Sequence, residues 1–369
     1  GSRDRKRSTL CLLAESSVEA DLWAASTRKA VAARLRALLP TTWDVDPLSD
    51  GAGTEPEAGP ATRVRKVDLP SYAVQAMQRL MDHTFICKWT KDRRGEPMPL
   101  RLKVAKVESV QNTPAWVSYT RSRQRICSEG RDARLSTLVP EVLTSTFDPG
   151  SGLFGGLDVN VNEHWLWHGT PAASADAIAK GAFRMDLAGS HRGSMYGKAV
   201  YLAECCSKAD EYSEVDEDGL CCMLLCRSLL GEVLVDAAKQ PSQEVIDLCK
   251  QSHNSLCADR WAAVGTFREF ALYDSNQAYP AYVVYYRRVM QEELLQELHH
   301  AECGSLAARQ LLPHLARLAE HHPRERVRHQ ISLMIATKTE IGLQPGPGPA
   351  GPGPGPAGPG PAGPGPAGP

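Results

Sequence analysis

The stretch from Trp165 to Arg288 constrains the fold of this chain more than any other part of the sequence. It holds several short apolar runs, including Trp165-Leu-Trp, Ala199 to Ala203, and a pair within Cys221 to Val235 that separates near Gly231. Apolar runs of this length, bounded by turn residues, are typical of strands in a mostly antiparallel sheet. They do not alternate regularly with long helices, which disfavours a doubly wound parallel sheet. The sequence therefore predicts an α+β fold.

Local signals before this stretch predict further elements. Apolar residues from Ala73 to Met81 recur at helical spacing, and Leu100 to Val110 alternates well enough for a strand. Asn112 or Thr113 can then cap a helix that has Pro114 at its first position.

Two signals within the stretch are expected to set element boundaries. Ser207 and Asp210 resemble a capping box for the helix that carries Tyr212. The apolar segment from Arg268 to Arg288 is expected to form two strands that separate around Pro280.

Composition divides the chain into five parts. These are a basic and helical N-terminal segment at 1–40, a linker at 41–68, a globular domain at 69–288, an all-helical segment at 289–343, and a Gly/Pro/Ala repeat tail at 344–369. The basic N-terminal cluster could contact nucleic acid or a targeting receptor, but so few charges favour a solvated terminus. The tail lacks glycine at every third position, so it is not collagen and is expected to be disordered.

Bulk properties disfavour several classes of protein. A formal net charge of −1 argues against a dominant surface for nucleic acid or membrane, and no apolar run reaches the length of a transmembrane helix. The 11 cysteines form no C-x-x-C pair, which indicates reduced thiols in an intracellular protein of the nucleus or cytoplasm. No metal site is expected, because no histidine pair in the C-terminal helical segment has acid or thiol partners at ligand spacing. These histidines are His299, His300, His314, His321 and His322.

Several residues of the central domain suit cleavage of the glycosidic bond of a dinucleotide. Such chemistry needs aromatic rings that stack on the leaving base, backbone groups close to its amide, and a carboxylate beside the sugar where positive charge develops. His168 and Gly169 end a strand, Tyr201 lies in a later strand, and Tyr212 lies in the helix that follows it. Glu269 would supply the carboxylate.

Glu269 lies in an alternating strand, in which Ala271 and Tyr273 share its face and Phe270 and Leu272 face the other way. Burial of this carboxylate without a partner would be costly, so it either faces a site or is paired. Taken singly, each candidate has an ordinary explanation, since strand tyrosines are usually core and strand glutamates usually face solvent. Their combination and order favour the functional interpretation.

The same segments carry motifs of a known family. They are Val107-Glu-Ser-Val-Gln-Asn112 followed by Trp116 and Tyr119, Leu166-Trp-His-Gly-Thr170, Gly197-Lys-Ala-Val-Tyr-Leu-Ala203, Ser207-Lys-Ala-Asp-Glu-Tyr212, and Glu269-Phe-Ala-Leu-Tyr273 with Gln277-Ala-Tyr-Pro280. In these motifs the chain resembles the poly(ADP-ribose) polymerase family of ADP-ribosyltransferases, over about Leu69 to Arg288. The Gln-Ala-Tyr-Pro piece resembles the tankyrase branch. The resemblance implies that 69–288 is a catalytic domain with mostly antiparallel split sheets and flanking helices.

The resemblance also implies an activity. The chain would transfer ADP-ribose from NAD to side chains of acceptor proteins, itself included, and release nicotinamide. His168 would bond the ribose of the adenosine half, and Gly169 would offer its backbone to the nicotinamide amide. Tyr201 and Tyr212 would stack on the nicotinamide ring.

Glu269 corresponds to the catalytic glutamate of the family, with Lys208 beside it, and a glutamate here favours elongation to poly(ADP-ribose). The catalytic residues so implied are His168, Tyr201, Lys208 and Glu269. The other residues implied to contact NAD are Thr170, Tyr196, Ala203 and Ala209, and 187–196 would be the loop that covers the bound dinucleotide. The alternative is a catalytically silent module that binds NAD or ADP-ribose, or a scaffold.

Two residues depart from the family pattern. Ala209 stands where the family usually has a serine that holds the nicotinamide amide, and losing one neutral hydrogen bond weakens binding about three- to tenfold. Ala199 replaces a customary glycine near the pocket. Residues 1–68 are too short and polar for the autoinhibitory helical domain of DNA-activated members, so no dependence on DNA is expected. The segment 289–343 could bind a partner protein, and no membrane partner is expected.

Overall fold

The computed structural model describes residues 64–129, 141–147, 153–154, 156–186 and 195–290, together with single residues or short groups within 26–43 and 293–336. The chain divides into two compact units, Gly1–Gln291 and Glu292–Pro369. Most of the expected N-terminal segment and linker, and the whole repeat tail, lie outside the described residues. Among the described residues, no helix has the length and apolar character to cross a bilayer.

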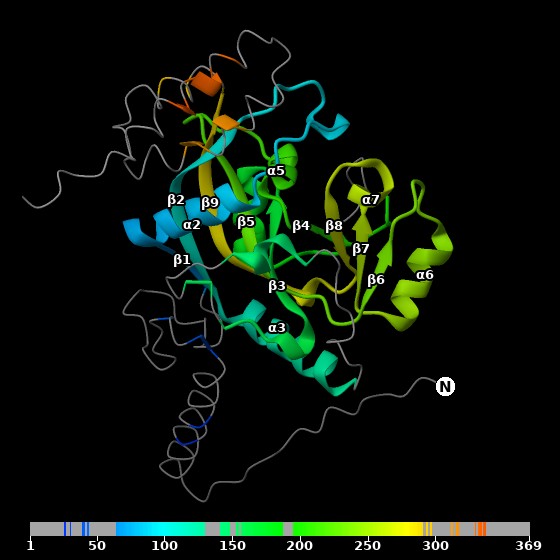
Figure 1. Cartoon of the computed structure of the whole chain (residues 1–369). Helices are drawn as coiled ribbons and strands as arrows, with labels where there is room; N and C mark the ends of the chain where they lie inside the picture. The colour runs from blue at the N-terminus through cyan, green and yellow to red at the C-terminus, as the bar shows by residue number, and fades with distance from the viewer. Residues whose placement is uncertain are drawn as a thin grey trace, which may run out of the picture. The chain divides into compact units, whose positions relative to one another are not determined.

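Nine strands within the described ranges form one sheet (Figure 1). They are β1 (Val64–Asp68), β2 (Arg101–Asn112), β3 (Glu163–Gly169), β4 (Val200–Ala203), β5 (Cys221–Leu229), β6 (Val233–Asp236), β7 (Ser255–Asp259), β8 (Arg268–Leu272) and β9 (Ala278–Val289). Their order is β1-β2-β9-β5-β3-β4-β8-β7-β6, and only β6 and β7 pair in parallel. The expected α+β class with a mostly antiparallel sheet is confirmed. β3 and β4 share a single register pair, Trp167 with Ala203, so the sheet comes close to splitting there.

Two details of the strand pattern differ from expectation. Val64–Asp68, expected as the end of the linker, is β1 and pairs along its whole length with β2. Pro280 lies inside β9, and the break after β8 falls at the 3₁₀ helix η7 (Ser275–Gln277) instead. The register between β5 and β9 shifts between Leu225 and Cys226, opposite Pro280. This irregularity accommodates the missing N–H of the proline within the sheet.

Helices lie beside the sheet in Figure 1. The α-helices are α2 (Ser71–Thr84), α3 (Thr113–Ser128), α4 (Ala172–Gly181), α5 (Cys206–Ala209), α6 (Gln243–Ser252) and α7 (Arg260–Val264). The remaining 3₁₀ helices are η2 (Lys91–Arg93), η4 (Leu143–Thr146), η5 (Val159–Val161) and η6 (Asp210–Tyr212). Asn112 caps α3 by accepting a hydrogen bond from the N–H of Ala115, and Pro114 lies in the first turn, as predicted.

The expected capping box at Ser207 and Asp210 is wrong. Cys205 is the N-cap of α5 and makes no side-chain capping bond. The Ser207 hydroxyl instead accepts a hydrogen bond from the N–H of Ile86, at 3.1 Å. A contact between distant segments has therefore replaced the local cap that the sequence suggested.

An aromatic cluster joins α3 to the centre of the sheet. The rings of Trp116, Tyr119 and Tyr279 pack with centroid distances between 4.9 and 6.0 Å. Trp43, only 7% exposed, adds its ring to this cluster at 5.9 Å from Trp116. Because Trp43 falls in the segment expected as a linker, that segment contributes to the core as well.

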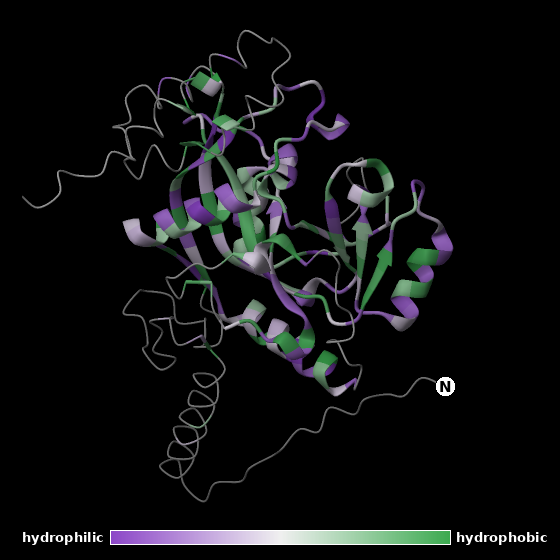
Figure 2. Cartoon of the chain, in the orientation of Figure 1, coloured by the Kyte–Doolittle hydropathy of each residue, from purple (hydrophilic) through white to green (hydrophobic). Residues whose placement is uncertain are grey.

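Both strands and helices supply the buried apolar residues, and the flanking helices carry an apolar and a polar side. Figure 2 shows β6 and β7 as mainly hydrophobic, whereas α6 has both hydrophobic and hydrophilic stripes. Ile246 and Cys249 of α6 are buried against Leu256 and Ala258 of β7. This half of the sheet therefore has its own core, beside the strand that carries Glu269.

In the second unit, the described residues are helical, and Leu311, Leu315 and Ile331 are buried. The five histidines of this segment, which were not expected to bind a metal, lie outside the described residues. An all-helical segment at 289–343 thus stays a prediction, with the correction that Val289 still belongs to β9.

Candidate active site

Three adjacent strands carry the central candidates. His168 lies on β3, Tyr201 on β4 and Glu269 on β8. In the pairing of β4 with β8, Tyr201 stands opposite Ala271 and Ala203 stands opposite Glu269. Residues separated by up to 101 positions in the sequence therefore lie on neighbouring strands.

The alternation predicted around Glu269 is confirmed. Phe270 and Leu272 are fully buried in one core cluster, while Ala271 and Tyr273 belong to the cluster that also includes Tyr201. Glu269 shares the second face, and its side chain is 23% exposed. The strand register thus directs this carboxylate away from the main core and toward the site.

His168 is held in one tautomer. Its Nδ1 lies 2.9 Å from the carbonyl oxygen of Tyr201. A carbonyl can only accept, so Nδ1 carries the proton. Burial lowers the pKa of His168, and the hydrogen bond to Tyr201 opposes this in part. The ring is therefore neutral near pH 7, and Nε2 keeps a lone pair that can accept a hydrogen bond from a hydroxyl. The edge of Phe183 fixes the ring plane, with centroids 5.0 Å apart.

Gly169 allows β3 and α5 to approach each other closely. A Cβ at this position would lie 1.7 Å from the carbonyl oxygen of Ala209 and 2.5 Å from its carbonyl carbon. No side chain larger than hydrogen fits there without moving the backbone of α5. The structure thus gives Gly169 a steric reason that is independent of any ligand.

The Tyr201 hydroxyl both donates and accepts a hydrogen bond within the protein. The hydroxyl donates to the carbonyl of Gly197 at 2.9 Å and accepts from the N–H of Tyr196 at 2.9 Å. Burial, and more weakly the nearby Glu269, raises the pKa of Tyr201 to about 12, although the bond from Tyr196 opposes this. The ring is consequently fixed and neutral, which suits stacking rather than proton transfer.

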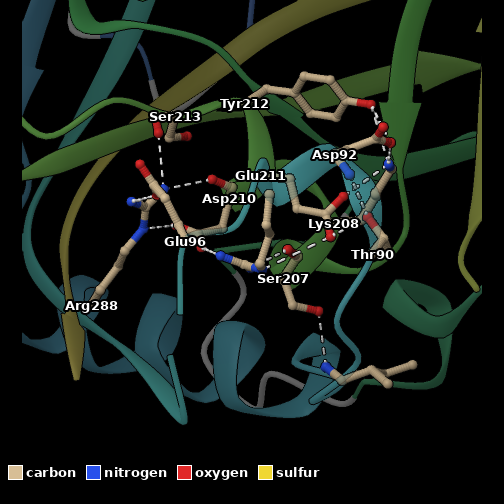
Figure 3. A network of polar contacts seen from close by, with 12 residues as sticks. Thr90, Asp92, Glu96, Ser207, Lys208, Asp210, Glu211, Tyr212, Ser213 and Arg288 are labelled. Atoms are coloured by element: carbon tan, nitrogen blue, oxygen red, sulfur yellow. Dashed lines mark hydrogen bonds and ion pairs between the residues drawn. The ribbon is translucent and has the colours of Figure 1, made fainter. Parts of the chain in front are cut away.

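Lys208 is the hub of the polar part of the site (Figure 3). It is 3% exposed, and its Nζ lies 2.6 Å from Asp92 Oδ2, 2.9 Å from Glu211 Oε2 and 3.1 Å from the Tyr212 hydroxyl. Glu269 Oε1 is farther away, at 3.5 Å. Burial alone would lower the pKa of Lys208, but the surrounding acidic groups, Glu269 foremost, raise it strongly. The ammonium is therefore charged throughout the accessible pH range.

The pKa values of the carboxylates around this lysine are shifted in different directions. Burial raises the pKa of Glu269, with smaller contributions from the charges of Asp92 and Glu211, and together these outweigh the attraction of Lys208 at 3.5 Å. Asp92 has the opposite balance, because its short contact with Lys208 outweighs burial and lowers its pKa. Asp92 is thus the firmly ionised partner, and Glu269 the one closer to gaining a proton.

A second network fixes the segments that carry these groups. The buried carboxylate of Asp210 accepts hydrogen bonds from Arg93 at 2.9 Å, Arg288 at 2.9 Å and the Tyr286 hydroxyl at 2.7 Å. Figure 3 shows Arg288 and Asp210 toward the left, and Lys208 with Asp92 toward the right. The turn at η2 is thereby attached to η6 and β9.

Not all predicted residues meet at the same place. Tyr196 is 3% exposed, and its hydroxyl donates to Asp236 on β6, while its N–H supports Tyr201. Thr170 follows β3, and its carbonyl accepts a long bond from the Cys222 thiol. Residues 187–194 of the expected covering loop lie outside the described residues. Contact of Tyr196 and Thr170 with NAD therefore stays a prediction.

Sequence reasoning missed the contribution of the segment before β2. Asp92 and Thr90, on the turn of η2, contact Lys208 and Glu211 respectively. The only local signal was that Thr90 caps this turn by accepting from the N–H of Asp92. Nothing in the sequence links Asp92 to a lysine 116 positions away.

The arrangement suits charge stabilisation at a sugar. It combines a neutral imidazole acceptor, two fixed tyrosines and a carboxylate whose pKa is tuned by a shared ammonium. Within the described residues, no group of three or more His, Cys, Asp or Glu side chains could hold a metal ion. The chemistry that these groups can perform is acid–base and electrostatic.

Comparisons with known proteins match part of the region that holds this candidate site. Residues 85–262 match the family model of the poly(ADP-ribose) polymerase catalytic domain, a range that includes His168, Tyr201 and Lys208 and ends before Glu269. The chain is 31% identical over 110 residues to a poly(ADP-ribose) polymerase tankyrase of Caenorhabditis elegans, covering 29% of this chain and 4% of that protein. It is 30% identical over 126 residues to the human mono-ADP-ribosyltransferase PARP12, covering 34% and 17%. A probable poly(ADP-ribose) polymerase of Dictyostelium discoideum is 27% identical over 199 residues, covering 53% and 48%.

Residues 85–262 are therefore similar to the catalytic domain of poly(ADP-ribose) polymerases, the family that the motifs resemble. A tankyrase and PARP12 both occur among the relatives, so the matches do not single out the tankyrase branch. The aligned region spans less than half the length of each of these relatives.

Proposed function

We propose that this chain transfers ADP-ribose from NAD to protein side chains, itself included, and elongates the product to poly(ADP-ribose). The observation that carries the proposal is the position of Glu269, on the strand next to Tyr201 and 3.5 Å from the buried ammonium of Lys208. The family match and the relatives named as ADP-ribosyltransferases support the same activity.

Each residue has a role that its geometry permits. His168 accepts a hydrogen bond from a ribose hydroxyl at Nε2, because its Nδ1 proton is committed to Tyr201. Tyr201 and Tyr212 hold the nicotinamide ring. Glu269 accepts a hydrogen bond from the neighbouring ribose and stabilises the positive charge that develops there. The glycosidic C–N bond breaks with its electron pair leaving on nicotinamide, and the acceptor side chain forms the new bond as it loses a proton.

Ala209 favours a second candidate, a silent module that binds NAD or ADP-ribose. Its side chain cannot supply the hydroxyl that usually holds the nicotinamide amide. The expected loss, about three- to tenfold in affinity, weakens NAD binding without removing any catalytic group. For this reason the transferase is the better-supported function.

Automodification with NAD labelled in its adenylate half tests the proposal. We expect the unaltered chain and a Glu244→Gln control on α6 to give a ladder of high-mass product. Glu269→Gln should give at most one discrete band, and His168→Ala should lose most of the label. A single band from the unaltered chain would contradict elongation. Label released as free ADP-ribose would indicate a hydrolase, and label remaining in NAD would indicate the silent module. We expect nicked DNA to change none of these results.

A further inference from the structure

The Lys208 ammonium has more oxygen neighbours than N–H groups that can donate hydrogen bonds to them. An ammonium has three N–H donors, and the three closest oxygens belong to Asp92, Glu211 and Tyr212, at 2.6, 2.9 and 3.1 Å. Glu269 is the fourth, at 3.5 Å. The ammonium therefore attracts Glu269 mainly by charge, while its three shortest contacts are with other groups.

The closest of these partners comes from outside the segments that carry the other site residues. Asp92 lies on η2, in a stretch that precedes β2, and the same Oδ2 atom also accepts from the Tyr212 hydroxyl at 3.1 Å. One carboxylate oxygen thus touches both the shared lysine and a ring expected to stack on nicotinamide. Figure 3 shows Asp92 beside Lys208 and Tyr212.

The position of Asp92 is fixed by its sequence neighbours. Thr90 donates to Glu211 at 2.8 Å, and Arg93, 3% exposed, donates to Asp210 at 2.9 Å and to the carbonyl of Ser207 at 3.0 Å. Residues on both sides of Asp92 are therefore anchored to α5 and η6. An aspartate placed in this way is a built feature of the site rather than a surface side chain that happens to reach it.

We propose that Asp92 is a positioning residue for the transfer reaction, which holds Lys208 and the Tyr212 hydroxyl and so leaves Glu269 free to bind the ribose. The proposal rests on the proposed function, because it assigns Glu269 the ribose as its partner. Without Asp92, the freed N–H of Lys208 would turn to Glu269 and occupy the oxygen that the substrate needs. Asp92 thereby tunes both the charge and the availability of the catalytic carboxylate.

The charge of Asp92 also affects when Glu269 ionises. The ionisable groups that face Glu269 are Lys208, Asp92, Glu211, Tyr201 and Tyr212. Removal of the negative charge of Asp92 removes a repulsion and strengthens the pull of Lys208, so the pKa of Glu269 falls. Because activity requires the Glu269 carboxylate, the acid limb of the pH profile of kcat/KM should move to lower pH.

The test compares Asp92→Asn with Glu96→Gln. Glu96 lies in the same stretch and pairs with Arg288, and its side chain is 63% exposed, so its variant removes one negative charge without touching the site. Asp92→Asn keeps an acceptor oxygen but turns a charge-assisted hydrogen bond from Lys208 into a weaker neutral one, so we expect it to lower kcat roughly tenfold and to move the acid limb to lower pH. Glu96→Gln should change neither, and Asp92→Glu should keep the acid limb in place because it keeps the charge.

A double-mutant cycle with Lys208→Met separates positioning from folding. If Asp92 acts through Lys208, Asp92→Asn should reduce kcat much less in the Lys208→Met background than in the unaltered chain. Equal losses in both backgrounds, or a loss of activity with an unmoved acid limb, would overturn the proposal and leave Asp92 with a structural role only.

Failure of the proposed function is a distinct outcome. If the unaltered chain turns over no NAD, the transferase assignment fails, and the side-chain carboxyl of Glu269 can still be titrated by NMR with ¹³C labelling. A lower titration midpoint for Glu269 in Asp92→Asn than in Glu96→Gln would support the arrangement proposed for the three charges. The same midpoint in both variants would overturn it.

Discussion

Substitution of Gly169 by alanine tests whether the site depends on the close approach of β3 and α5. The new Cβ would lie 1.7 Å from the Ala209 carbonyl oxygen, whereas real Cβ contacts do not fall below 3.0 Å. The backbone of α5 must therefore move by at least about 1.3 Å, the difference between these two distances. The obstacle is backbone rather than the end of a flexible side chain, so rotation of a side chain cannot relieve it.

Two consequences of this shift can be measured. Overpacking of this kind costs about 1–3 kcal/mol of the free energy of unfolding. The same movement displaces Lys208, one residue before Ala209, relative to Glu269. A displacement of about 1 Å in a catalytic group can reduce turnover about a hundredfold. We therefore expect a moderate loss of stability together with a much larger loss of activity.

Urea unfolding and NAD turnover of Gly169→Ala, measured side by side, check this reasoning. Gly181→Ala is the matched control, since Gly181 ends α4 with open space around its Cα. That variant should retain activity and be slightly more stable, because alanine loses less chain entropy than glycine in a helix. If Gly169→Ala bound NAD and turned it over as the unaltered chain does, the geometric argument for this glycine would be refuted.

Three further predictions follow from the site. At neutral pH, Glu269→Gln should have a larger free energy of unfolding in urea than the unaltered chain. The gain is about 1.4 kcal/mol for each pH unit by which folding raises the pKa of Glu269. It should vanish when unfolding is measured below the ordinary glutamate pKa. The sign follows because a raised carboxyl pKa destabilises the folded state above the unfolded pKa, and removal of the group removes that penalty. Ala209→Ser should tighten NAD binding about three- to tenfold in calorimetry, and unchanged affinity would mean that another group already holds the amide. Asp210→Asn should cost about 3–5 kcal/mol in urea unfolding, because it leaves the buried Arg93 and the partly buried Arg288 without their shared charge; a loss below 1 kcal/mol would contradict that account.

The sequence predicted those parts of the fold in which local and global signals agree. The alternation around Glu269, the Asn112 cap with Pro114, and the separation near Gly231 all appear where expected. In each case a short pattern of side chains is sufficient, because the same residues that set the local conformation also pack against the core. The motifs around His168 and Lys208 likewise predicted strand and helix positions that the structure places near one another, on β3 and α5.

The predictions from sequence are wrong where contacts between distant segments determine the local structure. Ser207 and Asp210 looked like a helix cap, but the structure uses them to anchor Ile86 and Arg93. The strand at Val64–Asp68 carries little hydrophobic pattern, since most of it is exposed, and it is defined by its pairing with β2. Such pairings are invisible to any rule that reads a short window.

The one-turn helices α5 and η6 carry residues that stabilise the fold directly beside residues of the candidate active site. In consecutive positions, Ala209 packs against Gly169, Asp210 turns to Arg93 and Arg288, and Glu211 and Tyr212 turn to Lys208. Lys208 and Tyr212, four positions apart, share one side as helical spacing places them, whereas Asp210 between them faces another direction. One short segment, α5 followed directly by η6, thus serves both networks. Substitutions at Asp210 should therefore lower stability first, whereas those at Lys208 should lower activity first.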